Sequence, residues 1–500
     1  MRRLLSAAAL ALVTGCYGLP EPPAPTNPLR ILLVNDVYVL DTLNDGRGGL
    51  HRVAALRERL AAEGPTLFVL AGDVLSPSLL SKYFGGRQMV EGFNAAGLDY
   101  ATFGNHEFEL DRDALVQRIA ESEFTWLSAN CFEASGEPFP GVQPWDTVRI
   151  GDRLIGIFGT TMQGDYRSYV RCGDPDSAAT ASLTALRSAG AGMVLALTHQ
   201  SADADLALLA RHPGIALVLG GHEHEAHTIR VGERHLLKAD ANSRTAQFVT
   251  VWGDTTGWRQ AVSLVPIDAR MPADTAVARI TAAWTDSLNA RLGAERIVGT
   301  AAVALDARDG PLRREERPIG NLVTDAMRAG TGADVALINA GTLRLDDVIG
   351  PGAVTSYQLE SMFLFPDDAR VVVFPVTGGR LRALLEHGVS EGNLGSGGFL
   401  QVSGVRFRYD PAQPSGSRIT GPLTRPDGTP IGADETVRVA FPVYPACQGG
   451  DGFDVPEAAA VCAGWHDQPR TVDLVIRYVT DSLGGVIEAP PGPRIESVGK

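Results

Sequence analysis

The chain has 500 residues, of which 44% are hydrophobic and 20% are charged, a composition that predicts a folded protein with more than one domain and excludes a disordered chain or a protein with many membrane spans. Lys and Arg total 44 against 58 Asp and Glu, so the formal net charge is −14. Such a surface repels polyphosphate backbones, which argues against a partner that is a nucleic acid polymer but leaves room for a small phosphate ester held by local arginines or cations.

The N-terminus has the features of an export signal. Two arginines precede the apolar run Leu4–Val13, which is too short to span a bilayer as a permanent helix. Val13-Thr14-Gly15-Cys16 resembles a bacterial lipobox. We therefore expect residues 1–15 to be a lipoprotein signal peptide and Cys16 to be lipidated, which would anchor an exported chain at the periplasmic or outer-membrane face of the cell envelope. The alternative is an ordinary buried helix with a chance cysteine. The proline-rich residues 16–28 predict an extended tether.

Four further cysteines stand at positions 131, 172, 447 and 462. An even number in an exported protein favours two disulfides. Cys447 and Cys462 would close a short loop, which leaves Cys131 and Cys172 as the second pair. Four cysteines permit three pairings, and free buried cysteines are the alternative.

Residues 29–270 alternate short apolar runs with loops and helical stretches. We expect helices at His51–Ala62 and Asp113–Glu121. Such alternation predicts a layered α/β domain, with ligands beyond the ends of the strands. The expected buried strands are Ile31–Val34, Leu67–Ala71, Tyr100–Gly104, Trp126–Ala129, Ile155–Gly159, Val194–Thr198 and Ala216–Gly220.

Apolar residues recur at helical spacing between Asp274 and Leu292. We interpret residues 271–295 as a linker helix that leads to a second domain at 296–500, in which strands and helices are mixed. The alternative is that this helix is only the last helix of the first domain.

Five segments that end expected strands carry side chains able to bind metals. Each segment alone is a weak signal, because Gly-Asp turns and single histidines are common in loops. Together they offer carboxylates, an amide and imidazoles, which suit Zn²⁺, Mn²⁺ or Fe²⁺. His222 and His224 are two residues apart, so both imidazoles would emerge on one face of an extended chain. The segments are Asn35-Asp36-Val37-Tyr38, Gly72-Asp73, Gly104-Asn105-His106-Glu107, Thr198-His199 and Gly220-Gly221-His222-Glu223-His224.

This ordered series resembles the calcineurin-like metallophosphoesterases, and specifically the bacterial 5′-nucleotidase family. The resemblance implies a β-sandwich flanked by helices and two divalent ions. It assigns one ion to Asp36, Asp73 and His224, and makes His106 the catalytic histidine. The second ion would bind Asp73, Asn105, His199 and His222. Two such cations share the charge of a phosphate and activate water as the attacking hydroxide.

Two positions depart from the family pattern. The family's first motif is usually Asp-x-His, whereas this chain has Tyr38 in place of the histidine. A phenol with a pKa near 10 binds a metal less readily than imidazole, so the first ion is either held more loosely, of a different kind, or bound by deprotonated Tyr38. The family also places Asp three residues after the catalytic histidine, and Glu109 stands here with the same charge.

Blocks of the second domain resemble the substrate domain of the same family, in the same order. By that resemblance Arg313 and Arg344 would bind phosphate, since guanidinium groups match its oxygens. Asn339 would contact the nucleoside, and Phe453, after Gly-Gly-Asp-Gly, would stack on a base. The second aromatic of the family has no aligned counterpart, although Phe365 could substitute for it.

The sequence as a whole predicts an exported, dimetal phosphohydrolase that removes phosphate from nucleotides, with cyclic nucleotides and nucleotide sugars as further candidate substrates. Two alternatives stay open. One is a thiosulfohydrolase-like enzyme on the same fold. The other is a non-catalytic surface lipoprotein with a degenerate metal site, which Tyr38 motivates. The oligomeric state is not predicted.

Overall fold

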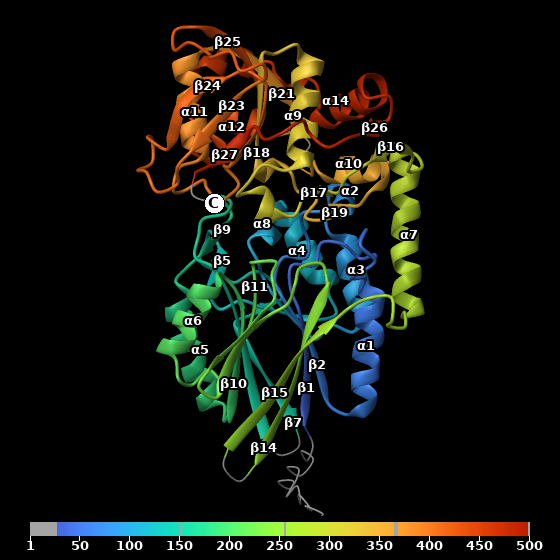
Figure 1. Ribbon diagram of the computed structural model, residues 1–500. Coiled ribbons are helices and arrows are strands. Elements are labelled where there is room, and N and C mark those ends of the chain that lie inside the picture. The colour runs from blue at the N-terminus through green and yellow to red at the C-terminus, as the bar shows by residue number, and fades with distance from the viewer. Residues whose placement is uncertain (1–27, 151–152, 255–256, 365–368, 499–500) are drawn as a thin grey trace, which may run out of the picture.

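The computed structural model describes residues 28–150, 153–254, 257–364 and 369–498. The expected signal peptide, Cys16, the tether and Phe365 lie outside these residues, so their predictions stay untested. Figure 1 shows two α/β domains stacked one above the other, with a long helix, α7 (Thr275–Leu292), along one side.

The N-terminal domain is built on two β-sheets. In the first, β1 to β4 run parallel and β14 and β15 are antiparallel, in the order β15-β14-β1-β2-β3-β4-β6. Its strands are β1 Leu29–Val34, β2 Thr66–Ala71, β3 Tyr100–Thr102, β4 Thr125–Leu127, β6 Val142–Gln143, β14 Thr245–Asp254 and β15 Gly257–Pro266. The second has the order β12-β13-β11-β10-β8-β7. Its strands are β7 Trp145–Ile150, β8 Arg153–Thr161, β10 Met193–His199, β11 Leu217–Gly221, β12 His227–Val231 and β13 Arg234–Lys238.

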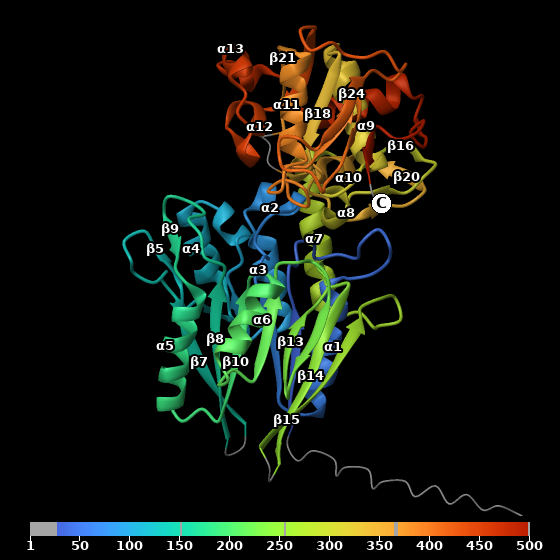
Figure 2. The same ribbon diagram turned by 60° about the vertical axis from the view of Figure 1, so that its left-hand side comes forward.

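The central strands are buried on both faces of their sheet. Successive side chains of a strand point to opposite faces, which is why nearly every position of these strands is apolar. In β1, Ile31 and Leu33 pack in the core between the two sheets, whereas Leu32 and Val34 pack on the outer side against helices. This arrangement confirms the expected sandwich flanked by helices (Figure 2). The flanking helices are α1 Leu50–Glu63, α3 Arg87–Ala96 and α4 Arg112–Glu121 on the first sheet, and α5 Pro175–Ser188 and α6 Ala202–Arg211 on the second.

Helix α7 begins at Asp274, whose carboxylate accepts hydrogen bonds from the backbone N–H groups of Ala276 and Val277. It packs across α1 and α3 and then leads into the second domain. Near its end, Leu288 joins Leu79 of α2 (Leu79–Phe84) and Leu364 in a small apolar cluster that includes Tyr357 of α10 (Ser356–Ser361). The helix therefore belongs to the packing of the first domain and also links it to the second.

The C-terminal domain mixes helices and sheets around one core. Its main sheet has the order β21-β25-β18-β22 and packs against α9 (Pro318–Thr331) and α11 (Gly378–Gly388). That sheet contains β18 Val335–Asn339, β21 Val371–Thr377, β22 Leu400–Ser403 and β25 Thr436–Pro442. The peripheral strands are β16 Ile297–Ala301, β17 Leu305–Asp306, β19 Val348–Ile349, β20 Gly352–Thr355, β23 Arg406–Tyr409, β24 Ile419–Thr424, β26 Val486–Ile487 and β27 Ile495–Ser497. The smaller helices are α8 Asp309–Leu312, α12 Val443–Cys447, α13 Ala459–Cys462 and α14 Thr471–Arg477.

Both expected disulfides are present. Cys131 and Cys172 stand opposite each other on β5 (Cys131–Glu133) and β9 (Val170–Cys172), and Cys447 is bonded to Cys462. Within the described ranges, no helix is both long enough and apolar enough to cross a bilayer.

Candidate metal centre and active site

The expected ligands meet at the domain boundary, because the strands that precede them end at the same edge of the sandwich. Four of them have left-handed backbone angles, which are unfavourable for residues other than glycine, Asn and Asp. The φ angles are 52° at Asp36, 58° at Asp73, 94° at His222 and 61° at His224. Positive φ angles at four expected ligands, of which only the two histidines are of a type that disfavours them, indicate a functional cluster rather than a set of ordinary turns.

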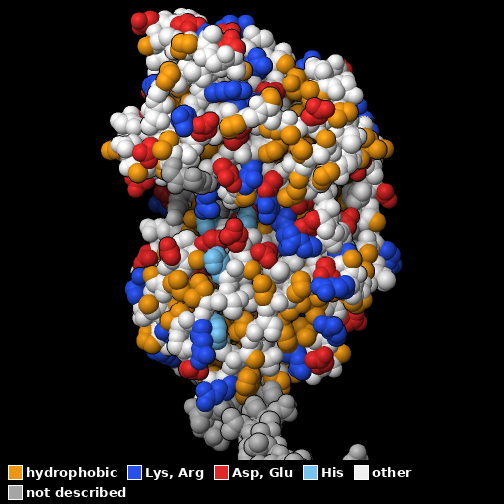
Figure 3. All heavy atoms as spheres, viewed as in Figure 1, with side chains coloured by type: hydrophobic (Ala, Val, Ile, Leu, Met, Phe, Trp, Pro, Cys, Tyr) orange, Lys and Arg blue, Asp and Glu red, His pale blue; other side chains and the backbone are white. Residues whose placement is uncertain are grey.

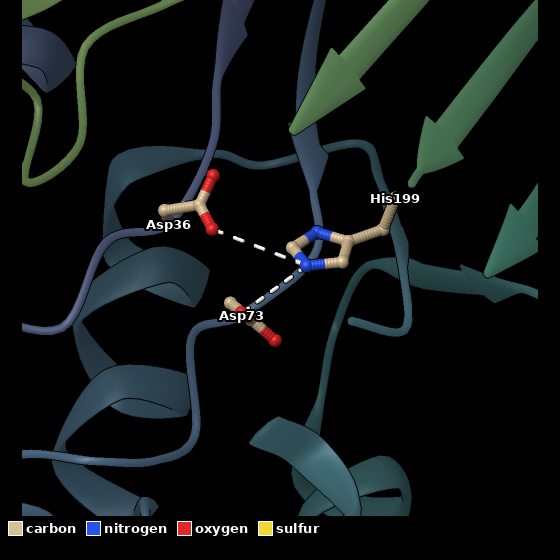
Figure 4. A group of neighbouring side chains, drawn as sticks. All are labelled: Asp36, Asp73 and His199. Carbon is tan, nitrogen blue, oxygen red and sulfur yellow. Dashed lines mark ion pairs between the residues drawn. The ribbon is translucent and has the colours of Figure 1, made fainter. Parts of the chain in front are cut away.

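Asp36, Asp73 and His199 form the centre of this cluster (Figure 4). Their ligand atoms lie within 4.8 Å of one another and all three residues are buried. His199 Nδ1 lies 2.8 Å from the carbonyl oxygen of Ala71, so an Nδ1–H would donate there and Nε2 would face Asp73 Oδ2 at 3.1 Å. Burial acts to lower the pKa of His199, but Asp73 and Asp36 raise it to about 10. The site thus favours positive charge strongly.

Tyr38 and His224 complete one side of the cluster. The Tyr38 hydroxyl lies 3.1 Å from Asp73 Oδ2, 3.0 Å from His224 Nε2 and 3.5 Å from Asp36 Oδ1. Burial and the charges of Asp73 and Asp36 raise the pKa of Tyr38 well above its usual value, so the phenol keeps its proton when no cation is present.

His224 is held from the other domain. Its Nδ1 lies 2.9 Å from Asp346 Oδ2, and Asp346 follows β18 in the C-terminal domain. Burial acts to lower the pKa of His224, but Asp346 raises it to about 9. The sequence did not point to Asp346, which is 122 positions from His224 and has no motif of its own.

The remaining expected ligands are His222 and Asn105. The rings of His199 and His222 are 5.3 Å apart, and burial and His199 lower the pKa of His222 to about 4. Asn105 Oδ1 is buried and has no partner with hydrogen-bond geometry in the described part of the chain. The next residue, His106, donates its N–H to Asp73 Oδ1 at 2.8 Å. An orphaned acceptor this close to the Asp73 carboxylate fits a divalent cation well, since unsatisfied buried polar atoms are otherwise costly.

His106 lies between Glu109 and a residue of the second domain. Its Nδ1 lies 2.6 Å from Glu109 Oε1, and its Nε2 lies 2.9 Å from Arg344 Nη2. Burial acts to raise the pKa of Glu109, but His106 and Arg344 lower it overall, so Glu109 is a carboxylate. With Nδ1–H donating to Glu109, Nε2 faces the domain boundary, where it could exchange a proton with a ligand.

Two buried charged side chains that the sequence did not single out hold the ligand loops in place. The fully buried Glu107 accepts hydrogen bonds from the backbone N–H groups of Asp73, Val74, Leu75 and Gly104, at 2.6 to 3.0 Å. It therefore fixes the loops that carry Asp73 and Asn105. Lys238 Nζ does the same for His199 and His222, because it donates to the carbonyl oxygens of their neighbours Gln200 and Gly221 at 2.6 and 2.7 Å.

The second domain supplies one wall of a cavity of about 520 Å³ next to His106. Arg313, Arg344 and Tyr444 line it from the C-terminal domain, and Asn105 and Tyr166 from the N-terminal domain. Figure 3 shows charged and histidine side chains gathered at this level, between the two domains.

Asn339 and Phe453 do not line this cavity. Asn339 is fully buried and donates to Asp451, which does line it, with Nδ2 2.6 Å from Asp451 Oδ2. Phe453 is 3% exposed and packs edge-on against Phe441 and His387. Its stacking role stays a prediction that this arrangement does not support.

Residues 29–226 match the calcineurin-like phosphoesterase family, and residues 297–458 match the 5′-nucleotidase C-terminal domain. The 5′-nucleotidase precursor from Thermus thermophilus has the same architecture over 95% of this chain and 100% of its own, with a TM-score of 0.80 and 25% identity. The chain belongs to the 5′-nucleotidase family.

This 5′-nucleotidase family member is accordingly a metallophosphoesterase-type hydrolase with a buried Asp/His group suited to metal. This chain is 25% identical to the trifunctional nucleotide phosphoesterase YfkN of Bacillus subtilis. The match covers 87% of this chain and 33% of that relative. The sulfate thiohydrolase SoxB of Thermus thermophilus shares the fold, with a TM-score of 0.76 at 17% identity over 96% of this chain and 98% of SoxB.

Proposed function

We propose that the protein removes the phosphate from nucleotides outside the cytoplasm, by hydrolysis of a nucleoside 5′-phosphate to a nucleoside and inorganic phosphate. The observation that carries this proposal is the position of His106. It stands between a metal-type ligand cluster on one side and the arginine-lined cavity on the other. A phosphate ester in that cavity would meet cations at one end and guanidinium groups at the other.

Two divalent ions of the Zn, Mn or Fe type would occupy the cluster. We assign the first to Asp36, Asp73 and His224, and the second to Asp73, Asn105, His199 and His222. Bound cations of this kind lower the pKa of water and offset the charge that develops on a phosphoryl group. Asp73 has two carboxylate oxygens and would contribute to both sets.

The protein's own groups then position the substrate and move a proton. Glu109 orients the His106 ring through Nδ1, so that Nε2 is aimed at the reacting phosphate or its leaving oxygen. Arg344, now 2.9 Å from Nε2, is placed to exchange that contact for a phosphate oxygen, with Arg313 farther along the same wall. We assign recognition of the nucleoside to Asn339, through Asp451, and to Phe453 if its ring leaves the core.

Export is part of the proposal. The two disulfides fit an oxidising compartment, where such bonds persist. We assign the membrane anchor to a lipid on Cys16. Incorporation of a labelled fatty acid into the wild-type chain and its loss in Cys16→Ser is the expected result, and labelling retained in Cys16→Ser contradicts it.

A substrate panel tests the chemistry. The purified protein is stripped of metal, resupplied with Mn²⁺ or Zn²⁺, and assayed for phosphate released from nucleoside monophosphates, cyclic nucleotides and nucleotide sugars. We expect release from at least one nucleoside 5′-phosphate. Sulfate released from a thiosulfonate, with no phosphate from any nucleotide, would establish the thiosulfohydrolase alternative. Fewer than two ions per chain at saturating metal, with no turnover, would support the non-catalytic one.

A further inference from the structure

Tyr38 lies at the point where the first ion is expected, and we propose that its phenolic oxygen is a ligand of that ion. The proposal rests on the metal site proposed above and adds a fourth donor to it. The side chain is 6% exposed, so its oxygen faces the cluster and not bulk solvent. Three donor atoms surround that oxygen: Asp73 Oδ2 at 3.1 Å, His224 Nε2 at 3.0 Å and Asp36 Oδ1 at 3.5 Å.

The spacing of these atoms is that of donors around one ion. Oxygen and nitrogen ligands lie about 2.1 Å from a first-row divalent ion, so neighbouring ligands in tetrahedral or octahedral arrangements lie about 3.0 to 3.4 Å apart. Besides the three distances from Tyr38, His224 Nε2 lies 3.5 Å from Asp36 Oδ1. All four separations therefore fall at or near the expected range.

Hydrogen bonds satisfy this arrangement only in part. A phenol has one proton to donate, yet carboxylate oxygens of both Asp73 and Asp36 face the Tyr38 oxygen. In the metal-free protein a protonated His224 donates from Nε2 to the same oxygen. If a divalent ion replaced that proton, Nε2, the phenolic oxygen and two carboxylate oxygens would converge on one buried point, where their charge needs a cation.

The backbone keeps Tyr38 in this position. Its N–H donates to Asn242 Oδ1 at 2.9 Å, and Asn242 N–H donates back to the carbonyl oxygen of Asp36 at 2.8 Å. The ring packs against His106 and His224, with centroids 6.0 and 5.5 Å away. The phenolic oxygen of Tyr38 would therefore bind an ion at this point without a large movement of the side chain.

Ligation also has a defined proton balance. The oxygen–metal bond forms as the O–H bond breaks, and the proton passes to water. Tyr38 and His224 also line a cavity of about 220 Å³ between the domains, which gives that proton a route to solvent. An anionic oxygen in place of a neutral imidazole favours harder ions, so the first site would prefer iron or manganese over zinc.

Spectroscopy of the metal-loaded protein tests the proposal without measuring turnover. Ferric ion, Mn²⁺ and Zn²⁺ are each added to the metal-free wild type, to Tyr38→Phe and to Tyr169→Phe. Tyr169 is a matched control because its hydroxyl donates to the carbonyl oxygen of Leu110, away from the cluster. Ultraviolet difference spectra report an ionised phenol, visible spectra report a phenolate-to-iron transition, and bound ions are counted.

We expect the wild type and Tyr169→Phe to show the phenolate signal on loading, and Tyr38→Phe to lose it and to bind one ion at least about tenfold more weakly. Tyr38→His, which restores the usual family ligand, should recover ion binding without the signal. Ions bound to the wild type with no phenolate signal, or a signal that survives in Tyr38→Phe, would overturn the ligand proposal alone. No ion bound to the wild type at all would overturn the proposed dimetal function with it.

Discussion

At the scale of single residues, the chemistry depends on how His106 is oriented. Its two ring nitrogens have different neighbours, Glu109 and Arg344, and each is within hydrogen-bond distance. Glu109 is itself held by Ser76, whose Oγ donates to Glu109 Oε2 at 2.8 Å. Glu109 is therefore held between Ser76 and His106, with one oxygen against each.

Replacement of Glu109 by Gln tests this orientation. The amide keeps the shape of the side chain but removes the charge that holds Nδ1–H, so we expect kcat for phosphate release to fall about 10- to 100-fold. The number of bound ions should not change. Ser76→Ala is a milder change at the same contact and should lower kcat less than Glu109→Gln does. Equal activity of Glu109→Gln and the wild type would show that Glu109 does not orient His106.

At the scale of elements, seven buried strands of the first domain were predictable, but the exact residues at which they end were not. The seven are β1, β2, β3, β4, β8, β10 and β11. Buried strands such as β1, β2, β10 and β11 stand out because uninterrupted apolar runs lie between turns. The run Tyr100–Gly104 was expected to be all strand, but β3 ends at Thr102. The chain must turn there to bring Gly104 against Asp73, where a Cβ atom on residue 104 would lie 2.0 Å from Asp73 Oδ1.

The site itself was partly predictable, because its expected metal ligands directly follow predicted strands. The topology of the sandwich brings the ends of these strands, and with them the ligands, to one edge. Asp346 could not be predicted, because no local pattern reports a contact between two domains. The burial of Phe453 could not be predicted from the sequence either, because it depends on how the ring packs against Phe441 and His387.

Glu107 gives a prediction at this scale, because one carboxylate joins two ligand loops. In Glu107→Gln one oxygen becomes an NH₂ group that faces backbone N–H donors, which leaves several buried donors unpaired. We expect a loss of about 2–4 kcal/mol in the free energy of unfolding, measured with urea, together with weaker metal binding. Glu58→Gln on the exposed face of α1 is the matched control and should change stability by less than about 0.5 kcal/mol. Glu107→Gln as stable as that control would contradict the role.

At the scale of the whole molecule, buried and partly buried polar contacts connect the domains. Asp346 lies against His224, Asp347 pairs with Arg244 at 2.8 Å, and Lys82 pairs with Glu360 at 3.4 Å. Through the contact with His224, Asp346 of the C-terminal domain orients a proposed metal ligand of the N-terminal domain. Docking of the two domains and retention of the first ion should therefore favour each other.

The pair of Asp346 and His224 makes a prediction for the metal-free protein. The folded pKa of His224, about 9, lies above its unfolded value near 6.5. The pair's contribution to stability is then fully present below pH of about 6.5 and is lost as the pH rises through about 9. Asp346→Asn should thus destabilise the metal-free protein by about 2 kcal/mol at pH of about 6 and by much less at pH of about 9.5.

Asp347→Asn is the control for that comparison. Its partner is Arg244 rather than a histidine, so chemical denaturation at the two pH values should show the same loss for this variant. A loss in Asp346→Asn that is likewise independent of pH would contradict the assigned contact with His224.

Phosphate release and bound ions, determined together for the wild type and His106→Ala, decide whether this protein is a dimetal nucleotidase. We expect the wild type to bind two ions per chain and to release phosphate from a nucleoside 5′-phosphate. We expect His106→Ala to keep both ions and to lose about 10²- to 10⁴-fold in kcat. Wild-type protein that carries its ions and hydrolyses no nucleotide would contradict the proposed function, and His106→Ala that turns over as fast as the wild type would contradict the role of His106.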